Sequence, residues 1–244
     1  MLTSPKHQQK LQALWRACAE GDLATVKSVL QDPKVDVNWV GREKGDTPFH
    51  RACRFGRTDI VKTLLDHATI IPNFQNAGLG HGMSLACQEG MLETLQVVML
   101  DPRINVNLRA KENSSSLWMA TLYGHFPCVR FLLTSNTPIE TTPRSDPGTL
   151  AWHNKTAAEI ARLVARAKYL DETPEEFDRC IKEGPEVGLL IEEYSQDHRA
   201  VSERLRRHPE VRGLSQFRAL LNLKLRVSQR GQDMNWPHNG WASA

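Results

Sequence analysis

The sequence lacks the features that mark membrane-spanning, secreted and strongly charged proteins. No apolar run approaches the roughly 18–20 residues that a membrane-spanning helix needs. The opening residues, "MLTSPKHQQKLQALWRACAEG", contain no apolar core or small-residue cleavage site of a signal peptide. The net charge of +3 over 244 residues is too small to argue for nucleic-acid binding by itself. We therefore expect an intracellular protein, cytoplasmic or nuclear.

Cysteine pairing is also missing from the sequence. The five cysteines are an odd number and form no C-x-x-C pair; they are Cys18, Cys53, Cys87, Cys128 and Cys180. A disulfide framework normally has an even set at short spacings. This usage indicates reduced thiols, which agrees with an intracellular protein.

Signatures of catalysis and metal binding are absent as well. The chain has no G-x-S-x-G, H-E-x-x-H or kinase-type motif, and no Lys-Ser/Thr follows the glycine-rich stretch 78–82. Two H-x-x-C spacings, His50/Cys53 and His125/Cys128, fall short of the four converging ligands of a zinc site. We predict no catalytic residue, no metal and no cofactor.

What the sequence does contain is a repeat. Glycines recur at intervals of 35, 34 and 34 residues, with an alanine four positions before each and an aliphatic residue five positions after each. The glycines are Gly21, Gly56, Gly90 and Gly124. A period of this length indicates a repeat architecture.

Each period reads as two helices joined by a turn. Apolar residues five, eight and nine positions past each glycine share one face of a helix. The glycine suits the turn because it tolerates positive φ. One such pair cannot bury its apolar face alone, so the pairs must stack. The predicted fold is an all-α solenoid of about five helix-turn-helix repeats with a C-terminal helical extension.

The stretch "TPFHRACRFGRTDIVKTLL" at 47–65 resembles the ankyrin repeat. The resemblance implies that Thr47–Pro48 opens a first helix and that Thr47 and His50 form hydrogen bonds within the unit. It also implies that "VDVN" (35–38), "INVN" (104–107) and, more weakly, "IIPN" (70–73) are the loops after second helices. Asn38, in "LQDPKVDVN", is similar to ankyrin asparagines that hydroxylases modify, which gives a hypothesis of hydroxylation to be tested at Asn38 and Asn107.

Other parts of the chain depart from this pattern. "HGMSLA" (81–86) lacks the Thr-Pro and the histidine, and "SSLWMA" (115–120) has Trp118 in the place of the histidine. We divide the chain into repeats 1–4 with an N-terminal capping helix (1–142), an interrupted fifth, capping repeat (143–194), a helical extension (195–230) and a disordered tail (231–244). In the fifth repeat, 155–165 is the expected first helix and 185–194 the expected second.

The resemblance also implies where a partner would bind. The two residues before each repeat glycine, which we name the concave row, would face the groove of the array, and the loops between repeats would add fingers. The candidate partner-binding residues are Glu20, Arg42, Lys44, Asp46, Arg54, Phe55, Gln88, Glu89, Lys111, Leu122, Tyr123 and Trp152. The structural alternative is that Phe55 or Leu122 packs between neighbouring first helices.

The predicted function is a non-enzymatic protein–protein interaction scaffold or adaptor. It would be monomeric and bind another protein through the concave face and fingers. One alternative is a regulatory ankyrin part of an enzyme-containing system. Another is binding of nucleic acid or lipid by the basic segment 195–230, although an acidic stretch at 171–194 directly precedes it and could pair with its arginines.

Overall fold

The computed structural model describes residues 4–41, 44–110, 113–135, 137–142, 154–164 and 174–207. These residues form eleven α-helices and no strand, which confirms the predicted all-α class. The helices are α1 (Pro5–Glu20), α2 (Leu23–Leu30), α3 (Pro48–Arg54), α4 (Thr58–Leu65), α5 (Gly82–Gln88), α6 (Leu92–Leu100), α7 (Ser116–Leu122), α8 (Phe126–Leu132), α9 (Ala157–Val164), α10 (Pro174–Gln196) and α11 (His198–Arg207).

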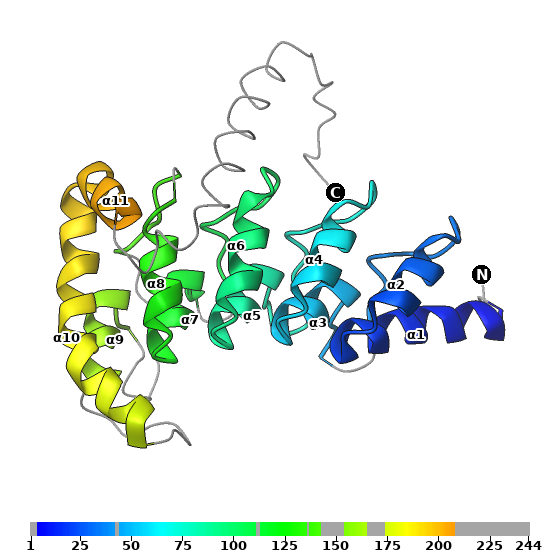
Figure 1. The fold of residues 1–244 in the computed structure, drawn as a ribbon, viewed down its shortest axis with the longest axis horizontal. Coiled ribbons are helices and arrows are strands. Elements are labelled where there is room, and N and C mark those ends of the chain that lie inside the picture. The colour runs from blue at the N-terminus through cyan, green and yellow to red at the C-terminus, as the bar shows by residue number, and fades with distance from the viewer. Residues whose placement is uncertain are drawn as a thin grey trace, which may run out of the picture.

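The helices pair along the chain and stack in two layers (Figure 1). The first helix of each unit packs on the first helix of the next, from α1 through α3, α5 and α7 to α9. The second helices α2, α4, α6, α8 and α10 form the other layer. This is the predicted solenoid, in which each unit buries its apolar face against its neighbours.

The repeat glycines lie at the predicted turns between paired helices. Their φ values are 90° at Gly21, 65° at Gly56, 67° at Gly90 and 69° at Gly124. The space beside Gly21 is filled by the next unit, since an added Cβ would lie 3.3 Å from Cδ of Arg57. Arg57 Nε also donates to the Ala19 carbonyl at 2.8 Å. Gly21, Gly56 and Gly90 therefore serve both the turn and the close approach of the following unit.

The start of α3 confirms the expected hydrogen bonds of Thr47 and His50. The Thr47 hydroxyl accepts from the His50 backbone N–H at 3.3 Å, and His50 Nδ1 accepts from the Thr47 backbone N–H at 3.1 Å. His50 Nε2 then donates to the carbonyls of Phe74 at 2.9 Å and Gly80 at 3.1 Å in the next loop. One buried histidine thus caps its own helix and ties two units together.

The start of α5 makes the same bonds with the two residue types exchanged. His81 is the N-cap, and its Nδ1 accepts from the Ser84 backbone N–H at 3.4 Å. The Ser84 hydroxyl accepts from the His81 backbone N–H at 3.0 Å. His81 Nε2 donates to the Leu108 carbonyl at 3.1 Å in the following loop. The unit that lacks the family motif in sequence therefore has a complete cap in structure.

In two other units a tryptophan makes the hydrogen bond to the next unit. Trp15 and Trp118 stand six residues before their repeat glycines, as His50 does. Trp15 Nε1 donates to the Asp46 carbonyl at 2.8 Å, and Trp118 Nε1 donates to the Lys155 carbonyl at 3.0 Å. Trp15, His50 and Trp118 therefore share one function, which is to donate a side-chain N–H to a carbonyl of the next loop.

Asparagines join successive loops on the other side of the array. Asn38 Nδ2 donates to the Thr69 carbonyl at 2.7 Å, and Asn38 Oδ1 accepts from the Ile71 N–H at 2.8 Å. Asn73 makes the same pair of bonds to the following loop, and so does Asn107. Both ends of each amide are in use, so these asparagines hold the loops in register.

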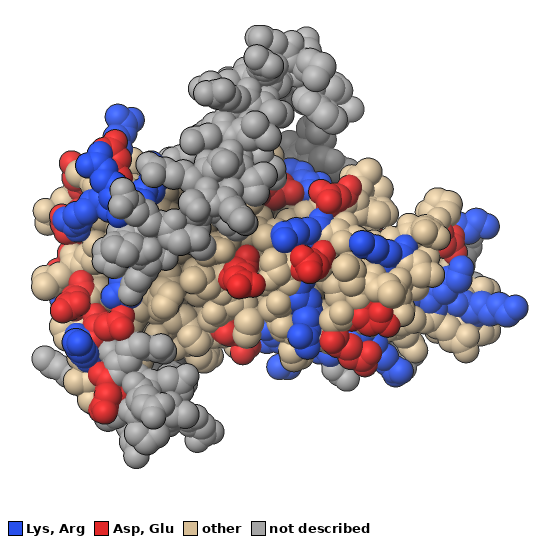
Figure 2. Space-filling view, viewed as in Figure 1, with Lys and Arg blue, Asp and Glu red and all other residues tan. Residues whose placement is uncertain are grey.

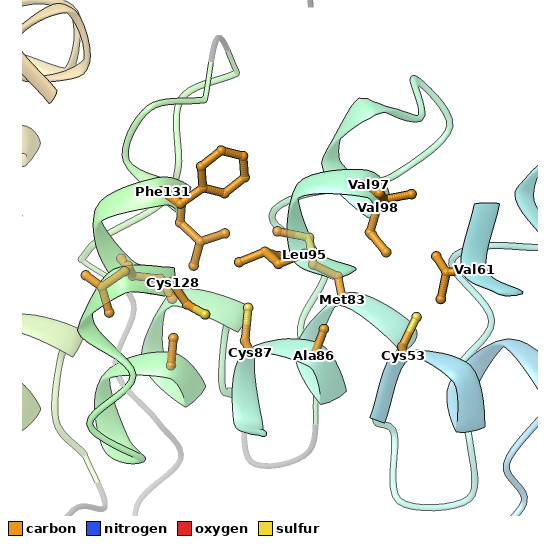
Figure 3. Packing of buried hydrophobic residues seen from close by; sticks show 14 of the residues in the cluster. Cys53, Val61, Met83, Ala86, Cys87, Leu95, Val97, Val98, Cys128 and Phe131 are labelled. Atoms are coloured by element: carbon orange, nitrogen blue, oxygen red, sulfur yellow. The ribbon is translucent and has the colours of Figure 1, made fainter. Parts of the chain in front are cut away.

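The core runs as one cluster through the stacked units (Figure 3). Cys53 and Cys87 come from first helices, and Cys128 comes from α8. All five cysteines are buried, and none of them forms a disulfide bond. Burial raises the pKa of Cys18 and of Cys128 to about 12, which keeps both thiols protonated at neutral pH.

The C-terminal unit differs from expectation at its second helix. The structure has α10 starting at Pro174 rather than 185, and the helix continues through Pro185. Pro185 is exposed, so the backbone carbonyl that loses its helical partner can be hydrated and the helix need not end there. At α9, Thr156 and Glu159 form a capping pair, in which the Glu159 N–H donates to Thr156 Oγ1 at 3.3 Å and the Thr156 N–H donates to Glu159 Oε2 at 2.8 Å.

Helices α10 and α11 close the stack against the fourth unit. Tyr194 is buried, and its hydroxyl accepts from the Ile139 N–H at 3.1 Å. From α11, Ser202 Oγ donates to the Leu133 carbonyl at 2.7 Å and Arg206 donates to the Thr134 carbonyl. The expected helix in the first part of segment 195–230 is thus present. The remainder of that segment and the predicted tail lie outside the described residues.

Candidate partner-binding surface

A cleft of about 570 Å³ opens on the first-helix layer, between the end of α3 and the helices α5 and α7. Five of the predicted partner-binding residues line it: Lys44, Arg54, Gln88, Leu122 and Tyr123. They come from three successive units. The fold therefore brings these members of the concave row, together with one finger residue, to a single site.

A chain of charges runs beside this cleft. Arg54 lies 3.4 Å from the carboxylate of Asp46 and 3.6 Å from that of Glu89. The Arg54 side chain is largely covered and Glu89 is half-buried. Arg54 is thus held in place by two carboxylates from different units, which fixes the direction of its guanidinium.

Asp46 differs from the expected exposed finger residue. It is only 1% exposed, and its carboxylate accepts from Asn76 Nδ2 at 2.6 Å as well as pairing with Arg54. A buried carboxylate needs such partners to offset its desolvation. Asp46 therefore supports the cleft from below, and we drop it from the set of residues that could touch a partner.

Asn76 organises the glycine-rich loop at 78–82. Its Oδ1 accepts from the N–H groups of Gly78 at 3.0 Å and Gly80 at 2.8 Å. A phosphate-binding loop would need such backbone N–H groups free to bind the anion. Here the N–H groups of Gly78 and Gly80 donate to the Asn76 side chain, so they are not available to an anion. The loop instead forms part of the wall of the cleft.

Phe55 lies next to the cleft without lining it. Its ring is 41% exposed and lies 4.9 Å from the guanidinium carbon of Arg51, which in turn lies 4.0 Å from the Trp15 ring centroid. The three side chains form a stack in which the cation is held between two aromatic rings. Phe55 therefore keeps an open face instead of being buried between first helices.

Tyr123 provides a half-buried aromatic wall. Its ring stacks on His125 with centroids 6.5 Å apart, and His125 Nε2 donates to the Gln88 carbonyl at 3.0 Å. Burial, and secondarily the nearby Glu89, raise the pKa of the Tyr123 phenol. The hydroxyl therefore remains a hydrogen-bond donor at neutral pH.

Four further predicted residues are not placed at this cleft by the described structure. Glu20 is exposed at the end of α1 and does not line the cleft. Arg42, Lys111 and Trp152 lie outside the described residues. For these four residues a role in partner binding stays a prediction.

Sequence reasoning missed several residues of the cleft. Met119 and Trp118 line it, one turn of α7 before Leu122 and Tyr123. Helical spacing could have found Met119, since residues i and i+4 share a face. Asn76 also lines the cleft, but its contacts with Asp46 and the glycine loop depend on the fold of neighbouring loops and have no local signal.

The residues that the structure describes show neither a metal cluster nor a membrane-spanning helix. In that part of the chain, no group of three or more His, Cys, Asp or Glu side chains could hold a metal ion. Among the same residues, no helix is both long and apolar enough to cross a membrane. The visible face carries interspersed charges of both signs (Figure 2). The basic α11 uses Arg204 in a 2.6 Å ion pair with Glu193, as expected for an arginine that meets the acidic stretch.

Comparisons with known proteins agree with this architecture. Residues 14–65 match the family model for ankyrin repeats in many copies. A probable E3 ubiquitin-protein ligase of Oryza sativa subsp. japonica is 30% identical over 128 residues, which is 50% of this chain and 24% of the ligase. Human ankyrin repeat domain-containing protein 7 is 42% identical over 59 residues, 24% of this chain and 23% of that protein.

A third match is to a human transient receptor potential cation channel, subfamily A member 1. It is 25% identical over 117 residues, 48% of this chain and 10% of the channel. The chain thus spans about a quarter or less of the length of these relatives. The match over residues 14–65, together with the repeat glycines and the capped helix pairs, identifies an ankyrin-repeat region in this chain.

Proposed function

We propose that this protein is a non-enzymatic scaffold or adaptor that binds another protein through the concave face of its ankyrin array. The observation that carries the proposal is the cleft, to which three units contribute Lys44, Arg54, Gln88, Leu122 and Tyr123. Ankyrin repeats are generally protein–protein interaction modules, and the repeats themselves are non-catalytic. The stacked helices supply a rigid support for this surface.

The residue types on this face favour a protein partner. Aromatic residues and arginine dominate the energetics of protein interfaces, and the face carries Phe55, Tyr123 and Arg54. The open face of Phe55 and the half-buried ring of Tyr123 would lose water on binding. The charges around them would set orientation and association rate.

A second function has one observation in its favour. The match to part of a probable E3 ubiquitin-protein ligase fits a regulatory ankyrin segment within an enzyme-containing system. In that case the concave face would select the protein on which the enzyme acts. Both functions use the same surface, and both fit an intracellular location, which the free cysteines favour.

A pull-down from cell lysate tests the surface. We compare the wild-type chain with the double variant Phe55→Ala/Tyr123→Ala and quantify the captured proteins by mass spectrometry. Truncating a hot spot costs at least about 2 kcal/mol, which is roughly a thirtyfold loss of affinity. The specific partner should therefore be lost, while the melting temperature should change little because both rings are partly exposed.

Leu189→Ala is the matched control. Leu189 is 61% exposed on α10, so its truncation removes an exposed apolar side chain away from the concave face. This variant should keep the partner. If the double variant also keeps every partner, the binding surface lies elsewhere. If it melts much earlier, the two rings stabilise the fold and the test must move to Gln88 and Leu122.

A further inference from the structure

The floor of the cleft is apolar and open to contact. Leu85 and Trp118 are buried, whereas Met119 and Leu122 are half-buried and keep part of their side chains accessible. A volume of about 570 Å³ falls within the range of roughly 300–1,000 Å³ that holds compact ligands. The cleft can therefore admit a large apolar side chain together with the backbone that carries it.

Most polar groups around this floor are already satisfied within the protein. Asn76 uses its amide on Asp46, Gly78 and Gly80. Ser84 Oγ donates to the His81 carbonyl at 2.8 Å, and Gln88 Nε2 donates to Glu89 Oε1 at 3.2 Å. These groups have little capacity left for a ligand, so they cannot select for a strongly polar one.

Two donors at the cleft remain unused. Lys44 is exposed, and across the described residues its ammonium forms no ion pair or hydrogen bond. The Tyr123 hydroxyl likewise has no hydrogen-bond partner in that part of the chain, although its ring is stacked. Among the described residues that line the cleft, none carries a carboxylate. Lys44 and Tyr123 therefore offer donors to an acceptor, and in the described part of the site the charge without a partner is the positive charge of Lys44.

We propose that this cleft binds an extended segment of a partner protein in which a large apolar side chain stands next to an aspartate or glutamate. The inference rests on the proposed function and specifies its partner. The apolar side chain contacts Met119 and Leu122, and the carboxylate faces Lys44, with Tyr123 as a second donor. A basic segment would meet the unpaired ammonium of Lys44 with like charge, which disfavours it.

The test uses random twelve-residue peptides displayed on phage and the immobilised 244-residue chain. Selected peptides should share an Asp or Glu adjacent to Leu, Ile, Phe or Trp. A fluorescein-labelled consensus peptide then gives the affinity by fluorescence anisotropy. Lys44→Glu should weaken its binding about tenfold, because the substitution turns an attraction into a repulsion. The same peptide with its acid changed to Gln should lose its dependence on residue 44.

Lys27→Glu is the matched control. Lys27 is an exposed lysine on α2 that does not line the cleft, so the same change of charge there should leave the affinity unaltered. Met119→Glu should abolish binding by placing a charge on the floor. Circular dichroism should show that each variant keeps its helix content.

The outcomes separate this inference from the proposed function. A basic consensus, a consensus without an acid, no consensus at all, or binding indifferent to Lys44→Glu overturns the inference. In each of these cases, loss of the lysate partner in Phe55→Ala/Tyr123→Ala still supports the proposed function. Conversely, a partner that survives those two substitutions counts against the proposed function even when peptides select the cleft.

Discussion

The unit of α3 and α4 and the unit of α5 and α6 both cap their first helix with a histidine and a hydroxyl residue, but the two residue types exchange positions. In the first, Thr47 is the N-cap and His50 reaches the next loop. In the second, His81 is both the N-cap and the residue that reaches the next loop, while Ser84 supplies the reciprocal hydroxyl. Ser84 and His50 occupy equivalent positions in the repeat, because each stands six residues before its repeat glycine. The hydrogen bonds show instead that His81 performs the function of His50, since both histidines bond to the next loop.

The largest effects should come from the two histidines. We expect His50→Ala and His81→Ala each to lower the free energy of unfolding by about 2–4 kcal/mol, because each leaves buried backbone groups without partners and removes a buried ring. Ser84→Ala should cost only about 1 kcal/mol. Urea denaturation measures all three. If Ser84→Ala lowers the free energy of unfolding as much as His50→Ala while His81→Ala lowers it little, the position in the repeat determines the contribution to stability. The bond to the next loop then does not.

A glycine explains why the second unit lacks the proline that opens α3. Gly82 occupies the place of Pro48, and an added Cβ there would lie 2.4 Å from Cε1 of Phe49 and 3.0 Å from Sγ of Cys53. Gly82→Ala should therefore destabilise the protein by about 1–3 kcal/mol through overpacking. The double variant Gly82→Ala/Phe49→Leu should cost less than the two single changes together, since the smaller side chain makes room. Strict additivity in urea denaturation would contradict this account.

Acid should weaken both caps. Burial lowers the pKa of His50 below its usual 6.5, and burial lowers that of His81 to about 4. The unfolded chain thus binds protons at pH values where the native histidines are still neutral. Stability is complete above about pH 6.5 and falls below it; for His81 the loss continues toward pH 4, by up to about 1.4 kcal/mol per pH unit, and His50 adds a loss in the same direction.

Thermal melts between pH 7 and 4.5 measure this dependence. Protonation at Nδ1 removes the acceptor for the cap N–H, which is the physical reason for the loss. His81→Thr should remove the contribution of His81 to the change of stability with pH. This holds whatever the substitution does to the stability at pH 7. Identical slopes for this variant and the wild type would exclude His81 as a source.

The smallest effect tests the exchange directly. The double variant Thr47→His/His50→Ser installs the α5 arrangement at α3. It should retain more stability than the two single changes predict, by a coupling of about 0.5–1 kcal/mol. A double-mutant cycle from urea denaturation gives this number. Zero coupling would mean that the arrangement at α5 depends on Gly82 and cannot be transferred.

The sequence predicted the layers of this fold because its period is strong. The glycines, the alanines before them and the aliphatic residues after them recur at fixed spacing, and local helix pattern then determines each pair. The start of α10 was not predictable in this way. An internal proline usually marks a boundary, and only the exposure of Pro185 in the folded chain shows why it does not act as one.

The candidate site was predictable to a similar degree. The concave row could be found because its members keep a constant offset from the repeat glycine, as Arg54, Gln88, Leu122 and Tyr123 do. The burial of Asp46 was not predictable, since it depends on Asn76 from the next unit and Arg54 from its own. Such contacts between loops leave no periodic signal in a single sequence.

The buried cysteines give the array five built-in reporters, one in each unit: Cys18, Cys53, Cys87, Cys128 and Cys180. A thiol reagent reacts with the thiolate, and a buried thiol can reach that form only when its surroundings open. The rate at which each cysteine is labelled therefore measures how often its own unit opens. Peptide mass spectrometry of a labelling time course would yield a stability profile along the solenoid without a single engineered residue.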